Sequence, residues 1–500
     1  MSLTYDISPH DPPKGTVRDW LDHRANGETV AFVFTDSSPD LTWAVLRDEA
    51  QKIASALTAQ GIEKGESIAI LQPNGREGIL AFYGAVYGGF RATMINLAAG
   101  QDAIAYALDH CEARIAMVHD SVIDMFQNAR PPAMKRLNDI TVCDVTLHDI
   151  SPSDHALLMY TSGTTGRPKG VVHTHSSLLA GGWTPTIAHG LSDQDRGLCV
   201  LPICHINGLC VTVMGALVSG GSVALAEKFS ASRFWDQIET TKSTWFSVVP
   251  TIISHLLHSD ANPVAHSSAR LRFGRSASSA LAPDVQTAFE ARFDLPIIET
   301  MGLTETAAQI LSNPLPPGVR KIGSPGVAYG NDVTILAPDL GECAPDVEGE
   351  IAISGPNVML EYLKNPKATQ AAFHGRWLRT GDLGRKDADG YLFVTGRLKE
   401  LIIKGGENIA PREIDEALYA HSDVIEAAAF ARPCKTYGER VEAAVRVREG
   451  SAVTNQDLIA MCIEKLGKFK APDHVHFLPE LPKGPSGKIQ RLKLLDLLTP

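Results

Sequence analysis

The chain has 500 residues, of which 44% are hydrophobic, and a formal net charge of −11. This length allows two or more domains with large cores, and the negative charge argues against broad electrostatic binding to nucleic acid. The eight cysteines include no Cys-x-x-Cys pair and no signal peptide is visible, so we expect reduced thiols in a cytoplasmic protein.

The first 160 residues predict helices that alternate with short buried strands. Apolar positions recur at helical spacing over residues 41–60, and a buried strand is predicted at 67–71. Helix and strand then alternate at residues 81–87, 92–95, 103–109 and 115–118. This pattern predicts a parallel sheet with helices on both faces. A further strand at 155–160 leads into a loop, at the position where an open α/β sheet binds its ligand.

That loop, residues 160–170, reads Tyr-Thr-Ser-Gly-Thr-Thr-Gly-Arg-Pro-Lys-Gly. It is suited to wrapping a polyphosphate, because glycines let backbone N–H groups approach, hydroxyls add donors and Lys169 adds a point charge. It differs from a P-loop, since Gly163 and Gly166 are too close and no Ser or Thr follows the lysine. The alternative is a mobile Ser/Gly linker, but apolar runs flank the loop on both sides.

Residues 206–226 form the longest stretch without charge or histidine. Its length could span a bilayer, but glycines and serines interrupt it, which predicts a buried helix followed by a turn and a strand. Cys199, Cys204 and Cys210 cluster here without a histidine pattern suited to zinc, although His205 leaves a metal site open.

The pattern changes beyond about residue 330, where short strands separated by turns are predicted at 333–336, 349–354 and 390–394. A helix is predicted from Pro411. A boundary near Lys399 would leave about a hundred residues, a common domain size. We therefore expect an α/β fold: a large N-terminal domain at 1–398, with parallel-sheet α/β layers and a β-rich subdomain, and a small mobile α+β domain at 399–500.

The loop at 160–170 resembles the phosphate-binding signature of the adenylate-forming superfamily, which includes acyl-CoA synthetases, adenylation domains of peptide synthetases and luciferases. Further similar segments follow in the family's order from about Leu157 to Arg491. The resemblance implies an ATP site, a magnesium ion, coenzyme A as acceptor, and a C-terminal domain that rotates about a hinge near Lys399. The nucleotide-binding residues that it implies are Thr161, Ser162, Gly163, Thr164, Thr165, Lys169, Ser278, Ser279, Thr300, Met301, Asp382 and Arg397.

Several of these residues carry a specific role through the resemblance. Ser278 and Ser279 would lie beside the adenine, and Met301 stands where most members have a tyrosine near the base. Asp382 matches the aspartate that binds both ribose hydroxyls, which a carboxylate can accept together, and Arg397 matches an arginine that reaches the ribose and AMP. Singly, the aspartate would be a turn residue and the arginine a surface cation; their order and spacing together favour the nucleotide site.

The resemblance also implies catalytic and metal-binding residues. Thr304 would donate to the α-phosphate, and Glu305, a hard oxygen ligand, would bind Mg²⁺; a helix cap is the competing interpretation of this pair. Lys488 matches the lysine that catalyses adenylation, where carboxylate attack on the α-phosphate brings two anions together. The competing interpretation is a solvated lysine near the end of the chain.

Lys404, Gly405 and Gly406 match a loop that enters the active site for the second half-reaction and lines the pantetheine tunnel. Lys404 is therefore a catalytic candidate and the two glycines are candidate coenzyme A contacts; a plain hairpin turn is the alternative.

The acid substrate is the least determined part. His205 matches a histidine beside the acyl pocket, and a neutral imidazole could donate to the substrate carboxylate. Arg275 and Ser276 form a pattern closer to oxalate–CoA ligases than to fatty acyl-CoA ligases. Arg275 could bind a second anionic group bidentately, or could face solvent or brace a strand. With Gly302 as a further substrate contact, we expect a small polar acid, such as a dicarboxylate or a sulfonated short acid.

These residues predict an ATP-dependent acyl-CoA ligase. ATP and a carboxylate would give an acyl-adenylate and pyrophosphate, and coenzyme A would then displace AMP. The expected partners are a small-molecule acid, no nucleic acid and no integral membrane segment, with a homodimer left open. The alternatives are a free-standing enzyme that loads an aryl or other acid onto a carrier protein, a luciferase-like oxygenase, and an inactive nucleotide-binding scaffold. The joint presence of the implied catalytic and binding side chains argues against the scaffold.

Overall fold

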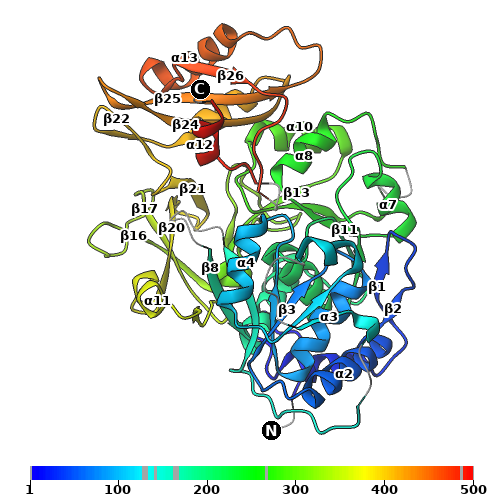
Figure 1. Cartoon of the computed structure of the whole chain (residues 1–500). Coiled ribbons are helices and arrows are strands. Elements are labelled where there is room, and N and C mark those ends of the chain that lie inside the picture. The colour runs from blue at the N-terminus through cyan, green and yellow to red at the C-terminus, as the bar shows by residue number, and fades with distance from the viewer. Residues whose placement is uncertain are drawn as a thin grey trace.

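The computed structural model describes residues 3–126, 133–139, 143–161, 168–264, 269–484 and 488–498. Two mostly parallel sheets form the large domain (Figure 1). The first sheet has the order β15 (Val327–Ala328), β14 (Ala308–Ser312), β13 (Ile297–Leu303), β12 (Phe273–Ser276), β11 (Trp245–Val248), β9 (Arg196–Cys199), β10 (Ser222–Leu225), β1 (Val30–Phe34) and β2 (Leu41–Thr42). The second has the order β18 (Glu361–Tyr362), β8 (Lys169–Thr174), β7 (His155–Thr161), β4 (Arg91–Met94), β3 (Ser67–Leu71), β5 (Ile115–Val118) and β6 (Ala133–Lys135).

A layer of helices fills the space between the two sheets. It contains α3 (Arg76–Gly88), α5 (His175–His189) and the π-helix η3 (Asn207–Met214). Almost every residue of these helices is buried, and one apolar core joins them to strands of both sheets. Because a helix surrounded by protein is apolar all round, these helices lack the one-sided stripe of a surface helix.

Other helices cover the outer faces of the sheets. α4 (Gln101–His110) packs on the outside of the second sheet, and the first sheet is covered by α7 (Phe234–Thr241), α8 (Pro250–Leu257) and α10 (Pro283–Phe293). The remaining helices of the large domain are α1 (Val17–Arg24), α2 (Trp43–Ala59), α6 (Gly215–Ser219), α11 (Pro366–Ala372) and the 3₁₀ turns η1 (Asp120–Phe126), η2 (Leu137–Asp139) and η4 (Thr304–Thr306). The predicted α/β layers are confirmed.

The apolar stretch at 206–226 folds as η3, α6 and β10, so the predicted sequence of helix, turn and strand is confirmed. Within the described residues, no helix is long and apolar enough to cross a membrane. The clustered cysteines Cys199, Cys204 and Cys210 are free thiols. The part of the chain that the structure describes holds no group of three His, Cys, Asp or Glu side chains suited to a metal.

Two smaller sheets follow in the C-terminal third. The β-rich subdomain contains β16 (Asp332–Leu336), β17 (Gly349–Ser354), β19 (Phe373–His374), β20 (Trp377–Lys386) and β21 (Leu392–Arg397). The last sheet contains β22 (Ile402–Lys404), β23 (Glu407–Ile409), β24 (Val424–Cys434), β25 (Gly438–Val447) and β26 (His474–Phe477). It packs with α12 (Pro411–Tyr419), α13 (Asn455–Lys470) and α14 (Leu492–Leu498) around cores of its own. β21 ends just before residue 398, where we propose the domain boundary.

The last sheet and helices α12, α13 and α14 form a C-terminal unit. This unit lies above α8 and α10 of the large domain (Figure 1). Ser254 of α8 donates to the carbonyl of Ile425 at 2.7 Å, and the His255 ring lies 3.0 Å from the buried carboxylate of Glu426. Arg412 of α12 bonds to backbone carbonyls of the large domain. These contacts fix the orientation that places the end of the chain over the carboxyl edge of the first sheet.

Candidate active site

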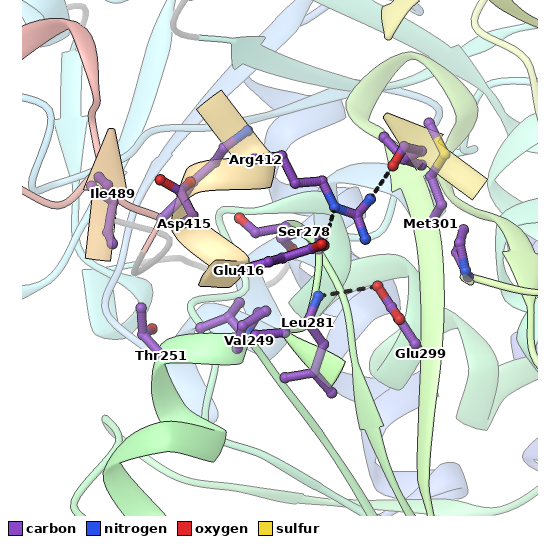
Figure 2. Close-up of a pocket in the computed structure, with 18 of the residues that line it drawn as sticks. Val249, Thr251, Ser278, Leu281, Glu299, Met301, Arg412, Asp415, Glu416 and Ile489 are labelled. Atoms are coloured by element: carbon purple, nitrogen blue, oxygen red, sulfur yellow. Dashed lines mark hydrogen bonds and ion pairs between the residues drawn. The ribbon is translucent and has the colours of Figure 1, made fainter. Parts of the chain in front are cut away.

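A cavity of about 210 Å³ lies between the large domain and the C-terminal unit. In Figure 2, Arg412, Asp415 and Glu416 of α12 lie across it from Leu281 and Glu299 of the large domain. The cavity brings together these predicted residues: Ser278, Ser279, Thr300, Met301, Gly302, Asp382, Arg397 and Lys488. Segments spread over more than two hundred positions of the sequence therefore share one site.

The floor of the cavity is built from the ends of β12 and β13. These strands run parallel, so their carboxyl ends meet at one edge. Ser278 has a φ of 73°, which turns the chain sharply after β12. Gly302 permits a close approach of β13 to β14, because a Cβ there would lie only 1.6 Å from the carbonyl oxygen of Ala308. A larger residue at this position would displace the cavity floor.

Asp382 and Arg397 face each other on neighbouring strands of the β-rich subdomain. They are register partners of β20 and β21, and the Arg397 Nε lies 2.6 Å from the Asp382 Oδ1. Asp382 is only 4% exposed, and burial raises its pKa against the opposing pull of Arg397. The pair thus offers a buried carboxylate next to a cation, a combination suited to ribose hydroxyls and a nearby phosphate.

Lys488 reaches the cavity from the C-terminal unit. Burial lowers its pKa to about 8, and the nearby Arg397 guanidinium acts in the same direction. The ammonium therefore lies in a poorly solvated site next to another cation. The carboxylates of Glu400 and Asp382 act in the opposite direction, so the site combines two cations with two acidic side chains. The two cations are suited to the phosphate groups of a ligand.

The position of Lys488 predicts a pH dependence of the first chemical step. Only the protonated amine can stabilise phosphoryl oxygens, and its pKa of about 8 means that this form is lost as the pH rises through that value. We expect kcat/KM for ATP to be level below about pH 7 and to fall about tenfold per unit above about pH 9. ATP–pyrophosphate exchange measured across this range checks it. In Lys488→Arg, kcat/KM for ATP should be lower but should not fall with rising pH, because arginine stays protonated. An unchanged fall in that variant would assign the ionisation to another group.

The predicted phosphate-binding turn is framed by Thr161 and Lys169, which are register partners at the ends of β7 and β8. Ser162, Gly163, Thr164 and Thr165 lie outside the described residues. The Lys169 Nζ lies 4.5 Å from the centre of the Tyr362 ring, and the Tyr362 hydroxyl donates to the Glu305 Oε1 at 2.8 Å. Tyr362 therefore connects the predicted phosphate and magnesium residues, and no sequence motif pointed to it.

Thr304 and Glu305 begin the short turn η4, half-buried between the two sheets. The carbonyl of Thr304 lies 2.7 Å from the Nε2 of His173. Burial lowers the pKa of His173 to about 4, so the ring is neutral at pH 7 and serves this contact as a donor. The turn is thereby tied to β8, which carries Lys169.

Glu299 is a cavity residue that sequence reasoning missed. Its Oε1 accepts from the Leu281 N–H at 3.1 Å (Figure 2), while its buried Oε2 has no hydrogen-bond partner among the described residues. Burial raises its pKa to about 7. An unpaired acceptor beside Met301 suits an amino group of a base. Its signal in the sequence is a carboxylate that ends the apolar run at 295–298.

The predicted acid-binding residues lie deeper in the large domain. Arg275 is 1% exposed, and its guanidinium donates to Asn207 Oδ1 at 2.8 Å, Ser247 Oγ at 3.0 Å and Gln309 Oε1 at 3.1 Å. No carboxylate of the described residues lies within 4 Å of it as an ion-pair partner. Burial lowers its pKa, but an arginine remains charged at neutral pH. The site thus holds a buried cation with only neutral partners, and the solvent-facing alternative is excluded.

His205 and Ser276 each have a buried polar atom without a partner in the described chain, His205 Nε2 and Ser276 Oγ. Burial lowers the pKa of His205 to about 4, so its ring is neutral, as the predicted role requires. Arg275 and Ser276 are successive residues of β12 and point to opposite faces of the sheet. Neither of them, nor His205, lines the cavity described above.

Asn207 is a third residue that the sequence did not single out. Its Oδ1 accepts from Arg275, and its Nδ2 donates to the Ser278 Oγ at 3.2 Å. One amide therefore connects the buried guanidinium with the loop that lines the cavity described above. It lies in the π-helix η3, an irregularity that is frequent at functional sites.

Lys404, Gly405 and Gly406 are placed away from the cavity in this orientation. The Lys404 Nζ donates to the carbonyl of Phe469 at 2.8 Å, and the glycines, with φ of 61° and 87°, form a two-residue hairpin between β22 and β23. The structure therefore does not bring these three residues together with Lys488.

The arrangement is that of an adenylate-forming enzyme: a nucleotide cavity at the edge of a parallel sheet, closed by a small unit that supplies a lysine. The residues present fit the cofactors of such an enzyme. The unpaired Oε2 of Glu299 suits an amino group of a base, Arg397 and Lys488 suit phosphates, and the half-buried Glu305 offers hard oxygen atoms to Mg²⁺.

Comparison with known proteins leads to the same class of enzyme. The AMP-binding enzyme family model matches residues 21–363, and the AMP-binding enzyme C-terminal domain model matches residues 413–488. The chain is 44% identical over 478 residues to the sulfoacetate–CoA ligase of Cupriavidus necator, covering 92% of this chain and 93% of that protein. It is 35% identical over 482 residues to the oxalate–CoA ligase of Arabidopsis thaliana, covering 90% and 92%.

A solved structure shows the same fold. O-succinylbenzoate coenzyme A synthetase from Bacillus subtilis, in complex with ATP and a magnesium ion, matches with a TM-score of 0.85 and 29% identity, covering 95% of this chain and 98% of that one. The chain belongs to the AMP-binding enzyme family. With these relatives it falls among the AMP-forming CoA ligases, acid–thiol ligases that use ATP, Mg²⁺ and coenzyme A.

Proposed function

We propose that this enzyme joins coenzyme A to a small acid that carries a second anionic group. The observation that supports this is the buried Arg275 guanidinium, whose described partners are all neutral. A buried charge is costly unless an opposite charge compensates it. The second anionic group of the acid would supply that charge. Two relatives are named for sulfoacetate and oxalate, which are both two-carbon acids with two anionic groups.

In the first step, an oxygen of the acid carboxylate would attack the α-phosphorus of ATP, and the bond to pyrophosphate would break. Lys488 and Thr304 would stabilise the charge on the phosphoryl oxygens. Asp382 and Arg397 would hold the ribose, and Ser278, Ser279, Thr300 and Met301 would surround the base. When bound at Glu305, Mg²⁺ would shield the charge of the triphosphate.

In the second step, the thiolate of coenzyme A would attack the acyl carbon and AMP would leave with the bonding electrons. Lys404, Gly405 and Gly406 would contact coenzyme A after a rotation of residues 399–500. His205 would donate to the acid near the reacting carboxylate, with Gly302 as a further contact. Ser276 points to the opposite face of β12 from Arg275, so it is not assigned to the same acid. A cytoplasmic location suits the buried free thiols of Cys111, Cys199, Cys210 and Cys462; a homodimer stays a prediction.

A panel of acids tests the proposed substrate class. Pyrophosphate release and coenzyme A thiol consumption would be measured with sulfoacetate, oxalate and malonate, and with acetate, benzoate and octanoate as acids of single charge. We expect kcat/KM to favour the best dianionic acid over acetate by about 10³-fold or more, because a site that pairs with a polar group rejects analogues without it. Assays without coenzyme A isolate the first step. Equal turnover of octanoate would contradict the proposal.

A further inference from the structure

Tyr362, the last residue of β18, makes two contacts with opposite charges. The Lys169 ammonium lies over its ring, 4.5 Å from the ring centre, and its hydroxyl donates to the Glu305 Oε1 at 2.8 Å. The side chain is only 7% exposed. One buried residue therefore contacts both the predicted phosphate cation and the predicted metal ligand.

The backbone around Tyr362 is fastened to the elements that carry these two residues. Tyr362 is the register partner of Val171 in β8, and the Leu363 N–H donates to the carbonyl of Gly170 at 2.8 Å. At the other end of the segment, the Met359 N–H donates to the carbonyl of Glu305 at 2.7 Å. The segment thus spans from the strand that begins at Lys169 to the turn that holds Glu305.

These contacts keep two opposite charges apart. Lys169 and Glu305 are both described, and no ion pair within 4 Å joins them. A ring face attracts an ammonium without using its N–H donors. A phenol uses one of about four acceptor positions of a carboxylate. Each charged group is therefore held in place and is still able to bind a ligand of opposite sign.

We propose that Tyr362 is a positioning residue for magnesium–ATP, which holds Lys169 for the triphosphate and Glu305 for the metal and prevents these two side chains from pairing with each other. This inference rests on the roles proposed above for Lys169 and Glu305.

The test separates the hydroxyl from the ring. Tyr362→Phe keeps the ring and removes the donor, so the Mg²⁺ concentration for half-maximal adenylation should rise about tenfold, the usual effect of losing a partner of a metal ligand. Its KM for ATP at saturating Mg²⁺ should stay near that of the unchanged enzyme. Tyr362→Leu also removes the ring, so its KM for ATP should rise by a further two- to fivefold or so. Thioester formation from supplied acyl-adenylate, which needs no triphosphate, should keep its rate in both variants.

Tyr391 provides a matched control. Its ring lies 4.5 Å from the Lys321 ammonium, and its hydroxyl donates to the carbonyl of Val319 at 2.6 Å, so its partners are neither Lys169 nor Glu305. Tyr391→Phe should leave the Mg²⁺ dependence unchanged. An unchanged Mg²⁺ requirement in Tyr362→Phe, or an equal fall of both half-reactions, would overturn the inference.

Binding of ATP tests the role of Tyr362 separately from the identity of the acid substrate. Calorimetric titration with ATP, with and without Mg²⁺, needs no acid. We expect Mg²⁺ to strengthen ATP binding to the unchanged enzyme and to do so about tenfold less in Tyr362→Phe. An equal effect of Mg²⁺ in both proteins would contradict the role of Tyr362, whatever the acid panel shows.

Discussion

Replacing Lys488 by alanine is expected to slow acyl-adenylate formation by about 10²–10³-fold, the usual effect of removing one group that stabilises developing charge. The ammonium lies in the cavity next to Arg397, where burial holds its pKa at about 8. Loss of the cation leaves the attacking carboxylate and the α-phosphate repelling each other. Single-turnover formation of acyl-AMP, followed by chromatography, measures the effect.

Two comparisons make this result specific. Thioester formation from supplied acyl-adenylate should retain most of its rate in Lys488→Ala, because no triphosphate takes part in that step. Lys493→Ala removes an exposed lysine of α14 only five positions along the chain and should leave both steps unchanged. Full-speed acyl-AMP formation by Lys488→Ala would contradict the proposed mechanism.

Replacing Arg275 by glutamine is expected to reduce kcat/KM for the preferred dianionic acid by about 10³-fold, because the site would lose the charge that pairs with the second anionic group. Turnover of acetate should change little or rise. Glutamine can still bond to Asn207 or Ser247, and the buried cation has no carboxylate partner in the described chain to leave unpaired. The midpoint of thermal unfolding should therefore shift by only a few degrees.

Arg272 is the matched control for this variant. It precedes β12 by one residue and pairs with Asp195 at 2.5 Å, so its charge has a carboxylate partner that Arg275 lacks among the described residues. Arg272→Gln should keep the preference between acids even if it lowers stability. Arg275→Lys keeps a charge but not the planar guanidinium. Its kcat/KM for the dianionic acid should lie between the values of the unchanged enzyme and Arg275→Gln. An equal loss with every acid in Arg275→Gln would remove the argument for specificity.

The sequence was most informative where a pattern is local. The alternation of helix and strand predicted β3 and β5 with their observed bounds, because buried strands are short apolar runs. It could not show that two sheets enclose α3 and α5, since a helix that is apolar on all sides has no periodic stripe. The assignment of strands to one sheet or the other depends on long-range pairing that no local pattern encodes.

The same distinction holds for the candidate site. Residues within linear motifs, such as Asp382 and Lys488, were predicted and are gathered at one cavity. Their individual roles stay predictions. Glu299, Asn207 and Tyr362 were missed because each acts through a contact with a distant segment. Strand alternation explains why Arg275 and Ser276, although adjacent in sequence, serve opposite faces of the sheet.

The amide of Asn207 has a consequence for how the affinities for the two substrates depend on each other. Its oxygen contacts the guanidinium at the proposed acid site and its nitrogen contacts a serine at the proposed nucleotide site, so any rotation of the amide alters both contacts. Whatever factor the acid contributes to the affinity for ATP, ATP must then return to the affinity for the acid, because the two sides of a thermodynamic cycle are equal. The affinities for the two substrates would thus be coupled through a single planar group.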